Sequence, residues 1–293
     1  MTPPAGGSRD GTTGGDTGTT EPPGATGSSG SPLELFHPLI RSWFLDNLGS
    51  PTPAQAAAWP AIARGDNVLL SAPTGSGKTL AAFLWTLNRY ATRDLAPGQL
   101  GVLYVSPLKA LGNDMERNLR RPLRALSSMQ DGSQPLLPPI QVAVRTGDTP
   151  GSQRQRMLRK PPEILITTPE SLHILLTSGG GRGLLSHVDT VVLDEIHAVA
   201  GSKRGAQLMV SVERLAALAG EFGRIALSAT VSPLEEVGRW VAGRVPSHTT
   251  AESGAPVYQP RPITCLQVGS GPHLESAPEG GKRYELLVDF PND

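Results

Sequence analysis

Residues 72–79 read Ala72-Pro73-Thr74-Gly75-Ser76-Gly77-Lys78-Thr79. An apolar run comes just before them at 68–71, and the segment 79–90 carries helix-forming residues with apolar side chains three and four positions apart. A buried strand, a glycine-rich turn and a helix together form the local structure in which a P-loop holds phosphate groups. The sequence therefore predicts an α/β nucleotide-binding domain of the P-loop class.

The residue types within this run suit a site for ATP and Mg²⁺. Gly75 and Gly77 allow backbone N–H groups to close around phosphate oxygens, because neither brings a Cβ atom. Lys78 would reach the β- and γ-phosphates, and the Thr79 hydroxyl would bind Mg²⁺. The alternative is a glycine-rich turn with a surface lysine, which the flanking strand and helix argue against. The predicted cofactor-binding residues here are Thr74, Gly75, Ser76, Gly77, Lys78 and Thr79.

A second apolar run, 188–193, reads as a parallel core strand and is followed by Asp194 and Glu195. Ligands of open α/β sheets bind at the carboxyl ends of the strands. We therefore expect Asp194 to hold Mg²⁺ and Glu195 to act as general base on the attacking water, with Lys78 as the third catalytic residue. Adjacent acids occur often by chance, so this interpretation depends on the P-loop upstream. His197 alone is more often a capping or core residue.

Four further apolar runs, at 102–105, 142–144, 164–166 and 225–227, are each followed by a short polar segment. In a parallel sheet these segments lie along one rim, where helix N-termini and turn N–H groups can bind backbone phosphates of a nucleic acid. Taken singly, a segment such as Thr168-Pro169-Glu170 is an ordinary helix start.

Together these segments resemble superfamily 2 helicases of the DExH type, and most of all the N-terminal RecA-like motor domain of the Lhr (large helicase-related) family. The first position of the P-loop, Ala72, is a variant that helicases often carry. The matching segments occur in family order: 53–55 as the Q motif, 106–111 as motif Ia, 145–149, 167–172 as motif Ib, 194–197 as the DExH motif and 228–230 as motif III.

The resemblance implies roles for individual residues. Gln55 would read the adenine edge, with Trp43, Phe44 or Phe36 as an aromatic face for the base. Coupling between ATP hydrolysis and movement on nucleic acid would use His197, Ser228 and Thr230. The residues implied to contact nucleic acid are Pro107, Lys109, Arg145, Thr146, Gly147, Thr168, Pro169 and Glu170.

Charge does not point to nucleic acid by itself, because Lys+Arg and Asp+Glu balance at 26 each. Any such site must be local. Two basic clusters would either form cationic stripes for a phosphate backbone or serve as solvated helix faces, and the sequence leaves both open. The clusters are Arg117, Arg120, Arg121 and Arg124, and Arg154, Arg156, Arg159 and Lys160.

Composition divides the chain into three parts. Residues 1–31 are rich in Gly, Pro, Ser and Thr, with too few apolar side chains for a core, and we expect a disordered tail. Residues 32–245 should form one RecA-like domain, with surface loops at 131–139 and 178–183 and a helix at 233–241. Residues 246–293 should form a linker with strands at 262–268 and 284–290 that leads toward a second RecA-like domain.

Several classes of protein are excluded by what the sequence holds. No stretch reaches the roughly 18 consecutive apolar residues of a membrane span. The single cysteine, Cys265, excludes a disulfide within the chain and a four-cysteine iron–sulfur cluster, and it fits a cytoplasmic location. The six His residues show no metal-ligand spacing.

The resemblance implies an ATP-dependent helicase that moves 3′-to-5′ on single-stranded DNA, unwinds DNA or RNA–DNA duplexes and serves DNA repair. The arginine fingers of such motors come from a second RecA-like domain. We find no Q-x-x-G-R-x-x-R-like segment, and we expect a truncated motor that needs a second domain in trans. The alternatives are a non-catalytic module that binds nucleotide or nucleic acid, and a P-loop enzyme acting on a small molecule, which the ordered motifs disfavour.

Overall fold

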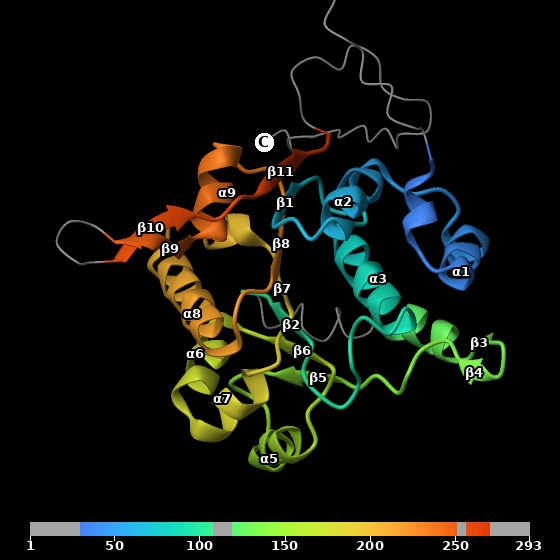
Figure 1. Ribbon diagram of the computed structural model, residues 1–293, viewed down its shortest axis with the longest axis horizontal. Coiled ribbons are helices and arrows are strands. Elements are labelled where there is room, and N and C mark those ends of the chain that lie inside the picture. Colours follow the sequence, from blue (N-terminus) through green and yellow to red (C-terminus); the bar gives the residue numbers. More distant parts are fainter. Residues whose placement is uncertain (1–29, 108–118, 251–255, 270–293) are drawn as a thin grey trace, which may run out of the picture. The chain divides into compact units, whose positions relative to one another are not determined.

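The computed structural model describes residues 30–107, 119–250 and 256–269 (Figure 1). The chain divides into two units, Met1–Ser31 and Pro32–Asp293, and the fold described below belongs to the second. Three predictions lie outside the described residues, wholly or for the most part. They are the disordered tail, the roles of Lys109 and Arg117, and the strand at 284–290.

A seven-stranded sheet with the order β11-β1-β8-β7-β2-β6-β5 forms the centre of the fold, and every neighbouring pair in it is parallel. The predicted class, α/β with a parallel sheet of the RecA-like type, is confirmed. The strands are β1 (Val68–Ser71), β2 (Val102–Val105), β5 (Val142–Arg145), β6 (Ile164–Thr167), β7 (Thr190–Leu193), β8 (Gly223–Ser228) and β11 (Thr264–Gln267).

The inner strands are near-continuous apolar runs because helices cover both faces of the sheet. All four residues of β1, β2, β6 and β7 are buried. Their side chains alternate between two cores: Val68 and Leu70 of β1 belong to one, and Leu69 to the other. The edge strands β5 and β11 are only half-buried for most of their length.

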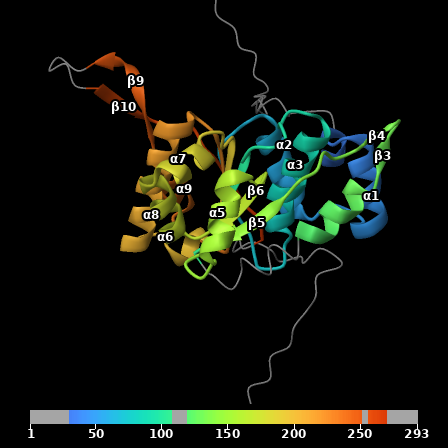
Figure 2. The same ribbon diagram turned by 90° about the horizontal axis from the view of Figure 1, so that it is seen from below.

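Helices form a layer on each face of this sheet (Figure 2). One layer holds the 3₁₀ helix η1 (Pro32–Leu35), α1 (Pro38–Leu48), α2 (Pro53–Ala63), α3 (Lys78–Ala91) and the helical residues 119–127. The other holds α5 (Gly151–Arg159), α6 (Pro169–Thr177), α7 (Gly179–Leu185), α8 (Lys203–Ala219) and α9 (Leu234–Ala242).

The aromatic residues near the chain's beginning pack inside the first layer. Phe36 meets the rings of Trp59 and Trp85 edge-on, with centroids 4.7 and 5.5 Å apart, and Phe44 meets Trp59 at 5.5 Å. Phe36, Phe44 and Trp43 are all buried. The prediction that one of these three side chains offers a face to the adenine base is therefore wrong, because they stabilise the core.

Two predicted loops are more ordered than their composition indicated. The segment 178–183 belongs mostly to α7: Ser178 caps the helix, and Gly181 is so close to the Leu175 carbonyl that a Cβ atom would lie 2.3 Å from its oxygen. Within 131–139, β3 (Gln130–Asp131) and β4 (Gln134–Pro135) form a short hairpin. The glycines and prolines of these segments indicated loops, whereas the structure has a helix in one segment and a short hairpin in the other.

The sheet extends past residue 245, into the segment predicted to be a linker. An antiparallel ribbon of β9 (Arg244–Thr250) and β10 (Pro256–Pro260) leads to β11, which pairs with β1. The predicted strand at 262–268 thus contains β11, and the predicted helix at 233–241 matches α9 within one residue. Among the described helices, none is long and apolar enough to cross a membrane.

Candidate nucleotide site and nucleic-acid rim

The sequence motifs lie along one rim of the sheet, because the carboxyl ends of all seven parallel strands meet at the same edge. The P-loop follows β1, the 228–230 segment follows β8, and Asp194 follows β7, and these three strands are neighbours. The segments after β2, β6 and β5 occupy the other half of the rim. The topology therefore separates the motifs assigned to ATP from those assigned to nucleic acid.

The P-loop joins β1 to α3 through two glycines with positive φ, Gly75 at 78° and Gly77 at 82°. The space where a Cβ of Gly75 would lie is open to 4 Å, whereas a Cβ on Gly77 would lie 2.6 Å from the Nε2 atom of Gln55. Helix α3 begins directly after the loop, with no side-chain cap on its N–H groups. An uncapped helix N-terminus of this kind favours anions.

Lys78 lies inside the loop rather than on the surface. Its side chain is 8% exposed, and its Nζ donates to the carbonyl oxygens of Ala72 at 2.5 Å and Pro73 at 2.8 Å. Burial lowers the pKa of Lys78, and the carboxylates of Glu195 and Asp194 oppose that shift. The ammonium therefore faces the two acids that follow β7.

Gln55 connects the start of α2 to the P-loop. Its Oε1 accepts from the Thr52 N–H at 2.9 Å, its Nε2 donates to the Gly77 carbonyl at 3.4 Å, and Thr52 Oγ1 donates to the Ser76 carbonyl at 2.7 Å. Thr52 and Gln55 also form a capping box. Reading of adenine by Gln55 stays a prediction, and it would require the amide to exchange at least one of these bonds.

Asp194 is held by a residue that the sequence analysis missed. Its carboxylate accepts from the Glu195 N–H at 2.9 Å and from the hydroxyl of Tyr104, a fully buried residue on β2. Thr79 is the other side chain that hydrogen-bonds this phenol. Burial raises the pKa of Asp194, and the bond from Tyr104 opposes that shift. A single hydroxyl thus joins the two residues predicted to bind Mg²⁺.

Glu195 and His197 link this centre to the segment after β8. Glu195 has a φ of 50°, rare for a residue with a side chain. His197 Nδ1 lies 3.3 Å from Glu195 Oε2 and 3.2 Å from the Ala229 N–H, which donates to it. One ring nitrogen cannot donate to the first and accept from the second at once. With Nδ1 accepting from the Ala229 N–H, the imidazole connects the DExH motif, to which His197 itself belongs, to the 228–230 segment, and its coupling role stays a prediction.

The 228–230 segment is tied directly to the P-loop. The Ala72 N–H donates to the Ser228 carbonyl at 3.1 Å, and Ser71 Oγ donates to the Ala229 carbonyl at 2.9 Å. Ser228 is buried and its Oγ lies 3.5 Å from His197 Nδ1, whereas Thr230 is exposed. Of the three predicted coupling residues, His197 and Ser228 are brought together and Thr230 points outward from them.

The predicted nucleic-acid residues divide into buried and accessible ones. Pro107, Arg145, Thr168 and Pro169 are buried, with Arg145 at 8% exposure and Thr168 capping α6 through its Oγ1. Burial and the charge of Arg154 lower the pKa of Arg145. The accessible members are Thr146, Gly147 and Glu170.

Glu170 pairs with an arginine that the predicted site did not include. Arg204 Nε lies 2.6 Å from Glu170 Oε1, and Nη2 lies 3.2 Å from Oε2. This pairing lowers the pKa of Glu170. A carboxylate does not attract a phosphate backbone, and the carboxylate of Glu170 is engaged by Arg204 instead. The basic segment that begins α8, Lys203-Arg204, was the available signal in the sequence.

Arg154 organises the loop after β5 and so does not belong to a free cationic stripe. Its Nη2 donates to the Gly147 carbonyl and its Nε to the Thr149 carbonyl, both at 2.7 Å. Thr149 Oγ1 in turn accepts from the Thr146 N–H at 2.9 Å. The backbone conformation of this predicted grip is thus fixed by the protein's own side chains.

Comparison with known proteins agrees with this geometry. The family model described as DEAD/DEAH box helicase matches residues 52–237. The chain is 50% identical over 235 residues to the Lhr helicase/probable uracil glycosylase of Mycolicibacterium smegmatis, covering 80% of this chain and 16% of that protein. It is 41% identical over 264 residues to the Lhr helicase/uracil glycosylase of Escherichia coli, covering 84% and 17%.

A solved structure of Mycobacterium smegmatis Lhr bound to ssDNA and AMP-PNP matches with a TM-score of 0.72 and 48% identity, over 83% of this chain and 29% of that one. The chain spans about a sixth of the length of the two curated relatives. The predicted resemblance to Lhr helicases is confirmed, and the chain belongs to the DEAD/DEAH box helicase family.

Proposed function

We propose that this chain is the ATP-binding motor domain of an ATP-dependent nucleic-acid helicase of the Lhr type. The observation that carries the proposal is the meeting of three loops on neighbouring strands: the P-loop after β1, the 228–230 segment after β8 and the DExH motif after β7. Hydrogen bonds join the P-loop to the 228–230 segment, and His197 of the DExH motif accepts a hydrogen bond from the Ala229 N–H of that segment.

The residues of this site fit ATP. The hydroxyl of Ser76 is buried and has no hydrogen-bond partner in the part of the chain that the structure describes. Gly75 leaves open space beside it, and the N–H groups at the start of α3 have no side-chain cap. Such donors around an open turn suit phosphate oxygens. The resemblance to an AMP-PNP-bound relative supports the same assignment.

The residues also fit Mg²⁺. Carboxylate and hydroxyl oxygens are hard ligands of the kind that Mg²⁺ prefers. Tyr104 hydrogen-bonds both the Asp194 carboxylate and the Thr79 hydroxyl and so keeps these two groups near each other. When bound, the ion would neutralise charge that develops on the phosphates. Lys78 would exchange its two carbonyl partners for phosphate oxygens, and Glu195 would take a proton from the attacking water.

The other half of the rim would hold a single nucleic-acid strand by its backbone. Thr146 and Gly147 after β5 and Arg204 beside Glu170 are the accessible groups for this role. Contacts of these kinds carry no sequence information, which suits a motor that steps along any strand. We place the activity in the cytoplasm, in partnership with a second RecA-like domain that supplies arginine fingers.

The test is ATP hydrolysis by the chain mixed with a second RecA-like domain of an Lhr relative, with and without single-stranded DNA. We expect hydrolysis that depends on the added domain and rises with DNA. Glu195→Gln should abolish hydrolysis and keep nucleotide binding, whereas Glu236→Gln, which removes an exposed carboxylate on α9, should change neither. Full hydrolysis by Glu195→Gln would contradict the assignment of the base. Nucleotide binding without any hydrolysis in the mixture would leave only a binding module.

A further inference from the structure

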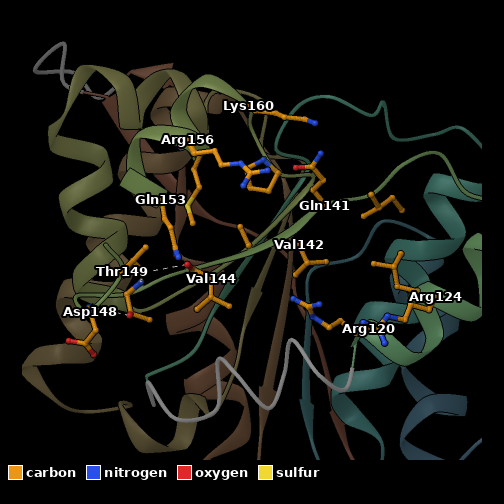
Figure 3. Close-up of a pocket in the computed structure, with 16 residues that line it drawn as sticks. Arg120, Arg124, Gln141, Val142, Val144, Asp148, Thr149, Gln153, Arg156 and Lys160 are labelled. Atoms are coloured by element: carbon orange, nitrogen blue, oxygen red, sulfur yellow. Dashed lines mark hydrogen bonds between the residues drawn. The ribbon is translucent and has the colours of Figure 1, made fainter. Parts of the chain in front are cut away.

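A groove of about 930 Å³ runs along the free edge of the sheet, beside β5 (Figure 3). Helix 119–127 forms one wall of the groove and α5 forms the other. Its apolar lining residues include Leu123 and Met157 of the two walls and Val142 and Val144 of β5. Among the described residues of the nucleic-acid rim, Thr146, Asp148 and Thr149 line the groove.

The edge strand turns unpaired backbone groups toward this groove. The Gln141 carbonyl accepts from the Ile164 N–H of β6 at 3.2 Å, so residues 141, 143 and 145 face β6 and Val142 and Val144 face away from it. Within the described part of the chain, the one hydrogen bond to these outward groups comes from Thr149 Oγ1, 3.4 Å from the Val144 carbonyl. Among the described residues, the N–H and C=O of Val142 and the N–H of Val144 have no such partner.

The two helices lie on opposite faces of the sheet. Val142, Val144 and Leu123 pack against the first core, whereas Ala143 packs against the second core, to which Met157 belongs. A polypeptide strand added beside β5, at the usual spacing of about 4.8 Å, would send alternate side chains toward the two helices. The groove thus has the shape that an additional strand would fill.

Positive charge lines both walls. Arg120 and Arg124 come from helix 119–127, and Arg156 and Lys160 come from the α5 side (Figure 3). Asp148 is the one acid among the lining residues that the structure describes. In the described residues, no side-chain hydrogen bond or ion pair engages Arg124, Arg156 or Lys160. Half of each basic cluster seen in the sequence therefore converges on one groove.

We propose that this groove binds an extended acidic polypeptide, which pairs its backbone with Val142 and Val144 and its carboxylates with the arginines of the two walls. Addition of a strand to an exposed edge is a general mode of peptide recognition. A nucleic-acid strand fits less well, because its phosphates accept hydrogen bonds but do not donate to the Val142 carbonyl. The described residues that line the groove also include no aromatic side chain on which bases would stack. This inference goes beyond the proposed function and does not depend on it.

The experiment uses the full chain and a fluorescein-labelled peptide, Glu-Val-Val-Glu-Glu-Val-Val-Glu, which presents both acidic and apolar side chains on each face of a strand. Fluorescence anisotropy measures affinity, and amide hydrogen exchange at Val142 and Val144 reports strand pairing. We expect binding with slower exchange at both amides. Arg124→Gln combined with Arg156→Gln should weaken binding about tenfold, since two ion pairs are lost.

The matched control is Arg121→Gln combined with Arg159→Gln. These two exposed arginines lie on the same helices and carry the same charge, but they do not line the groove. The control should bind the peptide within about twofold of the unmodified chain, because ion pairs outside the groove add little. ATP binding should be unchanged in both double variants, because none of the four arginines lies at the P-loop, and this separates a failure here from a failure of the nucleotide site.

Four results would overturn the proposal. They are no peptide binding, equal binding of a peptide with Lys in place of Glu, binding without protection of Val142 and Val144, and equal weakening by the two double variants. If single-stranded DNA displaces the peptide, and the groove variant weakens DNA binding, the groove belongs to the nucleic-acid site instead.

Discussion

Replacing Tyr104 by Phe removes one hydroxyl, the one that hydrogen-bonds Asp194. The ring itself stacks on Phe83 with centroids 5.0 Å apart, and that contact is kept in the variant. Asp194, only 5% exposed, would retain the Glu195 N–H as a donor at 2.9 Å. A hydrogen bond to a charged group contributes about 1.5–3 kcal/mol, and loss of a residue that orients a metal ligand costs about 10–100-fold in metal affinity. We therefore expect Mg²⁺-dependent ATP binding to weaken about 10–100-fold.

The assay is a Mg²⁺ titration of the binding of a fluorescent ATP analogue, repeated across pH. Because the Tyr104 bond lowers the pKa of Asp194, its loss should raise that pKa further above the ordinary range. Protons would then compete with Mg²⁺ for the carboxylate more strongly, so the deficit of the variant should be largest at acid pH and shrink as pH rises. A deficit that is independent of pH would argue for general damage to the fold.

Tyr90→Phe provides the control. Tyr90 is also a fully buried phenol, but it donates to the Glu163 carbonyl at 3.3 Å, away from the P-loop. The Tyr90→Phe variant also loses one buried phenol hydroxyl, but that hydroxyl makes no contact with Asp194. Its Mg²⁺ titration should therefore match that of the unmodified chain. Equal Mg²⁺ dependence in the two variants would refute the role of Tyr104.

Three further variants test other parts of the account. Lys78→Ala should abolish ATP-analogue binding, because the phosphates lose their cation; retained binding by calorimetry would contradict this. Asp194→Asn should raise the melting temperature at neutral pH and remove the Mg²⁺ dependence of nucleotide binding. Burial raises the pKa of Asp194, so its ionised form destabilises the fold as pH rises, and the amide removes that cost. A lower melting temperature of the variant would refute this. Arg261 lowers the pKa of Glu221, so stability from this pair is present above the unfolded carboxyl pKa of about 4.3 and is lost as pH falls through the lowered value. Arg261→Gln should flatten this acid loss in denaturant melts, and an unchanged pH profile would exclude the pair.

The strands that form the rim were predictable because each is a short apolar run bounded by polar residues. Four such runs, β1, β2, β6 and β7, are fully buried. A strand covered by helices on both faces is apolar along its length and does not alternate between apolar and polar residues. Helix α7 was not predictable, since a glycine-rich segment favours a loop unless tertiary packing decides otherwise. That packing comes from Leu184 and Leu185, which are buried against the second core.

The candidate site was predictable where a residue type and its position after a strand coincide, as for Lys78, Asp194 and Glu195. Tyr104 was missed because a tyrosine within an apolar run looks like a core residue, and only the fold brings its hydroxyl to Asp194. Glu170 was predicted to contact nucleic acid, and its pairing with Arg204 was not predicted because Arg204 lies 34 positions later in the chain. Contacts between distant segments of this kind are set by the topology and leave no local pattern.

The most direct test of the nucleotide site is a crystal structure of the chain with Mg²⁺ and AMP-PNP. The quantity to measure is the distance from Lys78 Nζ to the Pro73 carbonyl oxygen, which is 2.8 Å here. We predict that this distance lengthens beyond hydrogen-bonding range as Lys78 turns to the phosphates, with the metal between Thr79 and Asp194. A nucleotide bound elsewhere, or bound in the loop while Lys78 keeps its carbonyl partners, would contradict the account.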